Sequence, residues 1–313
     1  MRPSARRPEG ASLLANLERV ILGKPTELTL VLVGVLAEGH VLMEDVPGVG
    51  KTTLARAVAR SLAVDFRRVQ FTPDLMPSDI LGTTVLRPAE GTFEFQPGPV
   101  FAHVLLADEV NRASPRTQSA LLEAMSERQV TIDGVTRPLP RPFFVIATQN
   151  PADYQGTYPL PEAQLDRFLL RVRLGYPAIE QELEMLYEQR EVHPLESLGP
   201  VATGEELRAM QAAVRAVRVD RAVARYQLEL IRRTRTHDDL ALGVSPRGAL
   251  GLFRASQAVA WLAARDYVTP ADVQAVATAV LAHRVELRPP ARYAGRSDVQ
   301  IVEAIVGEVP VPT

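Results

Sequence analysis

Residues 40–53 read HVLMEDVPGVGKTT, which is an apolar strand, a Pro/Gly turn and a Lys-Thr pair that opens an apolar-periodic helix. This order of strand, glycine-rich turn and helix is typical of a P-loop. Such a loop wraps a phosphate chain with consecutive backbone N–H groups. Glycine is therefore needed at Gly48 and Gly50, where a Cβ would collide or the backbone must enter the left-handed region. The following helix points its positive end at the phosphates.

The side chains of this stretch predict a nucleotide site with a metal ion. Lys51 would reach the β- and γ-phosphates, and the Thr52 hydroxyl would bind the Mg²⁺ that bridges them. The predicted nucleotide-binding residues are Val46, Pro47, Gly48, Val49, Gly50, Lys51, Thr52 and Thr53. The P-loop alone indicates a nucleoside triphosphate and Mg²⁺ as cofactors. Asp45 stands where the strict pattern has glycine, so we expect its carboxylate to point away from the phosphates, which it would repel.

Composition limits the remaining possibilities. The 313 residues are 46% hydrophobic, which is enough for one large core or two unequal ones, and we expect two domains. A net charge of −2 does not favour DNA or anionic lipid as a partner. There is no cysteine, and the five histidines lack the spacing of a helical zinc site, so we expect them to be structural.

The sequence predicts a cytoplasmic location. Charged residues interrupt the N-terminal apolar stretch, so it does not match a signal peptide, and the longest apolar run, 28–37, is too short to span a bilayer.

Apolar strands alternate with helices as far as about residue 176, which predicts a parallel sheet covered on both faces. Helices are expected at 11–22, 25–37 and 114–128, and strands at 66–71, 101–107, 143–148 and 169–174. Two hairpins are expected at about 83–97 and 129–140, the second around Asp133-Gly134. From there on only helical spacing recurs, with 193–200 as the linker. The expected domains are therefore an α/β core over 1–192 and an all-helical domain with a C-terminal tail over 193–313.

Polar residues follow two of the buried strands, where a parallel sheet places its ligand. Asp108 fits a carboxylate that holds the hydration shell of Mg²⁺, and Glu109 fits the base that activates the attacking water. Asn150 could hydrogen-bond the γ-phosphate and that water. Arg247 follows a good N-cap, Ser245, and so lies at a helix start where an anion is expected. Two basic clusters lack interleaved aromatic residues and are interpreted as solvated helix faces: Arg215, Arg218, Arg221 and Arg225, and Arg232, Arg233 and Arg235.

Together with the P-loop, three blocks resemble the MoxR family of AAA+ ATPases over about residues 15–288. These blocks are LLADEVNR ending at Arg112, ATQNP ending at Pro151 and LPEAQLDRF ending at Phe168. Related magnesium-chelatase ATPase subunits share them. The resemblance implies a P-loop AAA+ core with a five-stranded parallel sheet and a helical lid. It also implies ATP, with Mg²⁺, as the cofactor and assembly into a ring, commonly a hexamer.

The resemblance also assigns roles. Lys51 and Thr52 match Walker A, Asp108 and Glu109 match Walker B, and Asn150 matches sensor 1. Arg167 matches the arginine finger, and Arg247 matches sensor 2 on the lid. The two hairpins resemble insertions that face the pore or a partner of the ring, although they could also merely extend the protomer.

The leading interpretation is an ATPase whose ring remodels, activates or assembles a client protein, for example a von Willebrand factor A domain protein or a metal-cofactor protein. The enzyme alternatives are a magnesium-chelatase-like motor subunit and a DNA-translocating helicase. A nucleotide-gated scaffold is the non-enzyme alternative. It is disfavoured because Glu109, Asn150 and Arg167, which match catalytic positions, are all present.

Overall fold

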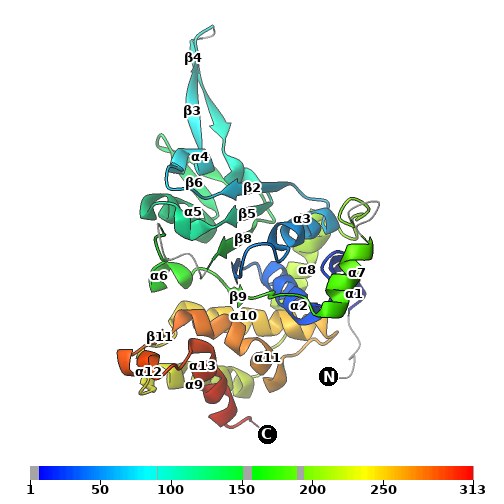
Figure 1. Cartoon of the computed structure of the whole chain (residues 1–313), viewed down its shortest axis with the longest axis vertical. Helices are drawn as coiled ribbons and strands as arrows, with labels where there is room; N and C mark the ends of the chain where they lie inside the picture. The colour runs from blue at the N-terminus through cyan, green and yellow to red at the C-terminus, as the bar shows by residue number, and fades with distance from the viewer. Residues whose placement is uncertain (1–6, 90, 151–156, 189–193, 313) are drawn as a thin grey trace.

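The computed structural model describes residues 7–89, 91–150, 157–188 and 194–312 (Figure 1). Its centre is a five-stranded sheet in the order β2-β5-β8-β1-β9, with all four neighbouring pairs parallel. The strands are β1 (Val41–Glu44), β2 (Phe66–Gln70), β5 (Val104–Asp108), β8 (Phe144–Gln149) and β9 (Leu170–Val172). This confirms the predicted five-stranded parallel sheet.

The sheet is buried on both faces, because successive side chains of a strand point to opposite sides. In β1, Val41 and Met43 belong to the hydrophobic core on one face and Leu42 to the core on the other. All five residues of β5 are buried. Apolar runs without alternation therefore marked the central strands correctly. The β5 strand starts later than expected, because Pro99–Phe101 forms a 3₁₀ turn.

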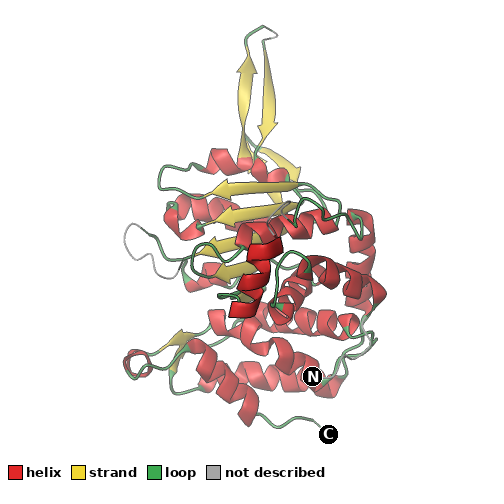
Figure 2. Ribbon diagram, turned by 45° about the vertical axis from the view of Figure 1, so that its right-hand side comes forward, coloured by secondary structure: helices red, strands yellow, loops and turns green. Residues whose placement is uncertain are grey.

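Helices cover both faces of the sheet (Figure 2). Those before β9 are α1 (Pro8–Glu18), α2 (Pro25–Leu36), α3 (Lys51–Ser61), α4 (Pro77–Leu81), α5 (Pro115–Glu127) and α6 (Glu162–Leu165), with a second 3₁₀ turn at Val110–Arg112. Most begin with proline, whose fixed φ suits the first helical turn. The Ser114 hydroxyl caps α5 by accepting a hydrogen bond from the Thr117 amide.

Both predicted hairpins are present. One pairs β3 (Gly82–Arg87) with β4 (Thr92–Pro97), and the other pairs β6 (Gln129–Ile132) with β7 (Val135–Pro138). The β3–β4 hairpin extends away from the body of the molecule (Figure 1). The Arg137 guanidinium lies 3.9 Å from the centroid of the Phe95 ring, so β7 contacts the base of the longer hairpin.

The C-terminal part is mainly helical and lies along the β9 side of the sheet (Figure 1). Helix α7 (Ile179–Glu188) lies beside α1 (Figure 1). The helices of the C-terminal part are α8 (Gly204–Ala216), α9 (Arg221–Thr236), α10 (Pro246–Leu262), α11 (Pro270–Leu281), α12 (Pro289–Tyr293) and α13 (Asp298–Glu308), with a 3₁₀ turn at Ala282–Arg284.

The expectation of an all-helical lid needs one correction. The strands β10 (Leu240–Leu242) and β11 (Glu286–Leu287) form a small antiparallel ribbon there. Strands of two or three residues are too short to show a period of two, so the pattern could not reveal them.

The predicted domain boundary at 192/193 lies outside the described residues. Helix α8 packs on both α2 of the core and α10 of the C-terminal part. No helix in the described ranges is long and apolar enough to cross a membrane.

Candidate active site

The P-loop joins β1 to α3 at the carboxyl edge of the sheet. Gly48 and Gly50 have φ angles of 86° and 93°, in the left-handed region that disfavours side chains. A Cβ at Gly48 would meet nothing within 4 Å, so backbone conformation rather than space calls for glycine there. Helix α3 begins at Lys51, and its first free N–H groups point into the loop. The loop can therefore cradle an anion with backbone amides.

Asp45 turns its carboxylate away from the loop, as predicted. The carboxylate is buried and accepts hydrogen bonds from the amides of Leu174 and Gly175, at 2.6 and 2.9 Å. These amides follow β9, so Asp45 ties the start of the P-loop to the segment that leaves the sheet. The departure from glycine thus has a structural role that a motif pattern does not indicate.

Replacing Asp45 by Ala should lower the free energy of unfolding by about 1–3 kcal/mol, because the buried Leu174 amide and the half-buried Gly175 amide would lose their acceptor. Urea unfolding followed by circular dichroism measures this change. The control is Asp238→Ala, an exposed aspartate that lies outside the site. Equal stability of the two variants would contradict the role given to Asp45.

Lys51 donates hydrogen bonds to the carbonyl oxygens of Asp45 and Val46, both at 2.9 Å. Burial lowers the pKa of its ammonium below the usual value of 10.5. Three carboxylates oppose this shift of the pKa, in decreasing order Asp45, Asp108 and Glu109. The charges of Asp108, which ends β5, and of Glu109, which follows it, therefore act on the P-loop lysine.

Asp108 is held at the end of β5 by two neighbouring strands. Its Oδ1 accepts a hydrogen bond from the Thr148 hydroxyl at 2.6 Å, and its Oδ2 accepts from the Arg68 guanidinium at 2.7 and 3.1 Å. The sequence analysis missed both partners, because they come from separate strands, β8 and β2. The only signal was that β2 and β8 would flank β5 in a parallel sheet, which brings Arg68 of β2 and Thr148 near the end of β8 toward Asp108.

Glu109 has a left-handed backbone, with φ 57° and ψ 51°. Its Oε2 accepts hydrogen bonds from Gln70 at 2.8 Å and from Arg112 at 3.0 Å. Its amide donates to the Thr148 hydroxyl at 2.8 Å, so one threonine fixes both acidic residues. Both side-chain partners bind Oε2, so Oε1 is the oxygen that can accept a proton from water while the carboxylate stays in place.

Asn150 is buried directly after β8, beside the strand that carries Asp108. In the described part of the chain no three acidic or histidine side chains gather around a common point. The predicted metal residues, Thr52 and Asp108, would suit Mg²⁺, which keeps several waters and takes few protein ligands in nucleotide sites. The chemistry of a hydroxyl and a carboxylate near a phosphate cradle fits that ion.

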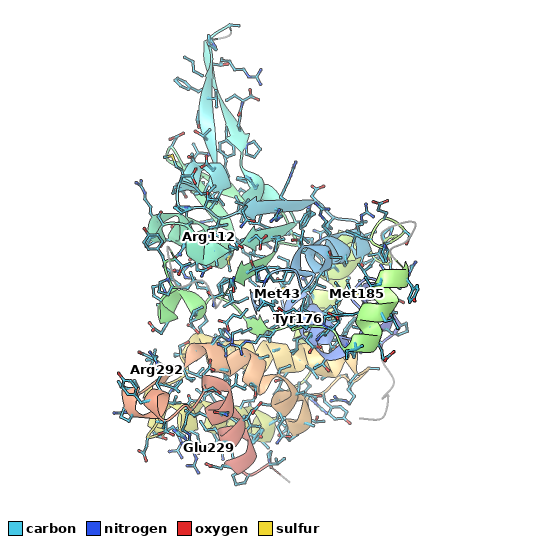
Figure 3. The ribbon with its side chains drawn as sticks, viewed as in Figure 1. Met43, Arg112, Tyr176, Met185, Glu229 and Arg292 are labelled. Carbon is cyan, nitrogen blue, oxygen red and sulfur yellow. The ribbon has the colours of Figure 1, made fainter. Side chains whose placement is uncertain are left out.

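A cavity of about 600 Å³ adjoins the P-loop, and the sequence analysis did not anticipate it. Apolar side chains from three segments line it: Val20, Ile21 and Leu22 after α1, Leu174 and Pro177 after β9, and Met185 and Leu186 on α7. Lys24 joins two of these segments by donating to the Tyr176 carbonyl at 2.8 Å. In the view of Figure 3, Met185 of α7 lies on one side of Met43 and Arg112 lies on the other. The site thus has an apolar side and a charged side.

Arg167 lies apart from this group. It follows α6, and its Nη1 donates to the Leu122 carbonyl and the Ser126 hydroxyl of α5, both at 2.8 Å. The same turn reaches the start of β1, since the Leu169 amide donates to the His40 carbonyl at 2.8 Å. Arg167 is therefore near the amino edge of the sheet, whereas the P-loop of the same chain is at the carboxyl edge.

Arg247 lies on the same side as Arg167, because a buried cluster joins its helix to the Arg167 turn. Asp166 accepts hydrogen bonds from the Ser245 hydroxyl and from Arg284 Nε, both at 2.9 Å. Arg247 is exposed at the start of α10, and its charge contributes to lowering the pKa of buried Arg284, although desolvation is the larger cause. The structure thus separates two predicted groups, the P-loop residues and the two arginines.

Arg284 was not singled out in the sequence, yet it holds this turn in place. Its guanidinium also donates to the carbonyls of Phe168 and Leu169.

Arg284→Met should lower the free energy of unfolding by about 3–5 kcal/mol, since it leaves Asp166 without its ionic partner. Urea unfolding measures this loss, with Arg292→Met, a substitution of an exposed arginine, as the control. A loss no larger than that of the control would contradict this role.

The fold and the site define the class: a parallel sheet in the order seen here, a P-loop, paired carboxylates and a helical lid make an AAA+ ATPase. Residues 40–170 match the family model for "ATPase family associated with various cellular activities (AAA)", and residues 232–305 match the AAA lid domain model.

Similar proteins specify the family. Chaperone MoxR1 of Mycobacterium tuberculosis is 44% identical over 87% of this chain and 74% of its own. Protein YeaC of Bacillus subtilis, uncharacterized, is 50% identical over 95% of this chain and 93% of its own. A crystal structure of a protein from Cytophaga hutchinsonii aligns with a TM-score of 0.90 and 37% identity, covering 97% of this chain and 95% of the other. The chain belongs to the MoxR family of AAA+ ATPases.

Proposed function

We propose that this ATPase hydrolyses MgATP at a site completed by a neighbouring subunit. The P-loop amides and Lys51 hold the phosphates, and the apolar cavity takes the adenine. Thr52 and Asp108 hold Mg²⁺, which when bound neutralises charge on the phosphate oxygens. Glu109 accepts a proton from the attacking water, and Asn150 orients that water. The position of Asp108 and Glu109 at the carboxyl end of β5, at the same edge of the sheet as the P-loop, supports these roles.

The observation that carries the proposal is the position of Arg167. It is held on α5 near the amino edge of the sheet, away from the P-loop of its own chain. An arginine there can stabilise the transferring phosphoryl group only on another subunit. Arg247 lies on the same side, so both arginines would be supplied in trans. In a ring, commonly a hexamer in this family, each subunit supplies its two arginines to the site of its neighbour, so that every site is complete.

The work of the ring is to change the conformation or assembly of a client protein. The related MoxR1 is named a chaperone, and the long β3–β4 hairpin, with Phe93 74% exposed at its outer part, offers a surface for a client. A von Willebrand factor A domain protein is the client we propose, in the cytoplasm. The net charge of −2 does not favour the DNA-translocating alternative.

The test is to trap the ATP-bound ring as Glu109→Gln and identify what co-purifies with it. Retention of a von Willebrand factor A domain protein, lost when ATP is omitted, supports the proposal. Retention of nucleic acid alone would favour a helicase, and a tetrapyrrole-binding partner would favour a magnesium-chelatase-like motor.

A further inference from the structure

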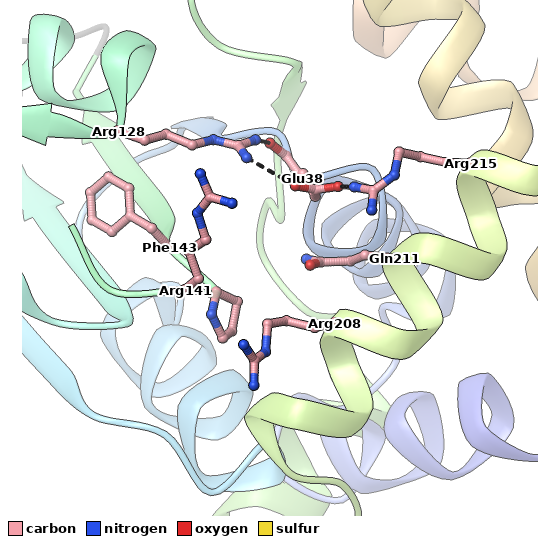
Figure 4. Close-up of a pocket in the computed structure, with 8 residues that line it drawn as sticks. Glu38, Arg128, Arg141, Phe143, Arg208, Gln211 and Arg215 are labelled. Atoms are coloured by element: carbon pink, nitrogen blue, oxygen red, sulfur yellow. Dashed lines mark hydrogen bonds and ion pairs between the residues drawn. The ribbon is translucent and has the colours of Figure 1, made fainter. Parts of the chain in front are cut away.

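A second hollow, of about 140 Å³, lies between the core and α8 (Figure 4). We call it the arginine pocket. It is lined by Glu38, Arg128, Arg141, Pro142, Phe143, Arg208, Gln211 and Arg215. The residues come from four segments: the turn after α2, the end of α5, the approach to β8, and α8. It shares no residue with the candidate active site.

The charges of this pocket do not balance. It has four arginines and one carboxylate, an excess of three positive charges. Glu38 accepts hydrogen bonds from Arg128 at 2.9 Å through Oε2 and pairs with Arg215 through Oε1. Both carboxylate oxygens are therefore already engaged by arginine. The remaining positive charge belongs to arginines that are exposed to solvent, so the hollow attracts a dissolved anion.

Arg141 and Arg208 are the two arginines without a carboxylate. Within the described ranges neither has a side-chain hydrogen bond or ion pair. Both are exposed, and they line the pocket from different segments (Figure 4). The amide nitrogen of Gln211 is occupied by the Val35 carbonyl at 2.8 Å, which leaves its oxygen at the pocket. The free donors of the pocket are thus guanidinium groups.

We propose that the arginine pocket binds a phosphate group. Phosphate carries close to two negative charges at pH 7 and has several acceptor oxygens, whereas a carboxylate would leave more of the excess charge uncompensated. Guanidinium forks match the spacing of phosphate oxygens. The volume is well below the ~300 Å³ at which pockets begin to enclose drug-sized ligands, so a nucleoside does not fit inside.

Binding there would join α8 to the core. Arg208 belongs to α8 and Arg141 to the core, so one phosphate that contacts both links the two parts. It would also lie beside the end of α5, the helix that holds Arg167. We therefore expect phosphate to raise the melting temperature of the protein.

The test is calorimetric titration with inorganic phosphate in the Lys51→Ala background, which weakens binding at the P-loop. The Arg141→Ala/Arg208→Ala pair should weaken binding at least ~30-fold, since it removes charge-assisted hydrogen bonds from two arginines. The matched control is Arg233→Ala/Arg292→Ala, which removes two exposed arginines elsewhere. Both double variants carry Lys51→Ala, so any phosphate that still binds at the P-loop contributes equally to the two titrations.

A second arm uses a phosphoserine peptide and its unphosphorylated form. If inorganic phosphate binds at least as tightly as the phosphopeptide, the natural source is a dissolved anion. If the phosphopeptide binds more tightly and its unphosphorylated form does not bind, the source is a phosphorylated protein. Equal affinity of the double variant and the control double, or no binding of either ligand up to ~10 mM, would overturn the proposal.

Discussion

Arg167→Ala should bind ATP with near-normal affinity and hydrolyse it ~10³-fold or more slowly. The side chain contacts α5 of its own chain and none of the described P-loop residues, so its loss leaves the nucleotide cradle intact. The variant loses the positive charge of the guanidinium, which stabilises the negative transferring phosphoryl group in the neighbouring subunit. Steady-state phosphate release and nucleotide titration measure the two effects separately.

Exposed Arg292→Ala is the control for Arg167→Ala, and it should keep wild-type turnover. Wild-type activity should also rise faster than linearly with protein concentration through the assembly range. Full specific activity in a dilute monomer would show that Arg167 is not needed in trans.

Glu109→Gln should bind ATP normally and turn over at least ~10²-fold more slowly, because only the proton acceptor for water is removed. Glutamine keeps the shape of the side chain and an oxygen that can accept from Gln70 and Arg112. Single-turnover hydrolysis and equilibrium ATP binding distinguish chemistry from affinity.

Lys51→Ala is the matched variant for binding, and it should lose most ATP affinity, because the phosphates lose a point charge. The two variants therefore fail at different steps. A similar loss of ATP affinity in both would contradict the separate roles of Lys51 and Glu109.

The fold could be predicted from the sequence where burial leaves a periodic or continuous apolar pattern. The central strands β5 and β8 are buried along their length, and the Asp133-Gly134 turn specifies the second hairpin through its positive φ angles of 52° and 76°. The β10–β11 ribbon and helices α7 and α13 were missed. The ribbon strands are too short to carry a period, and the sequence analysis did not single out the two helices.

The P-loop and the acidic pair could be located because each follows a recognisable strand. Their partners could not, since Gln70, Arg68 and Thr148 become neighbours only through strand order. The same holds for Arg284, which meets Asp166 from 118 residues away in the chain. Motifs therefore indicate which groups do chemistry, whereas packing decides what holds them.

The central claim is that Arg167 acts on the nucleotide of a neighbouring subunit. Mixing Arg167→Ala with Lys51→Ala tests it most directly, because each is expected to be inactive alone. A mixed ring pairs the intact P-loop of the first with the intact Arg167 of the second, so ATP turnover should partly return. No recovery in rings shown to contain both subunits would contradict the claim.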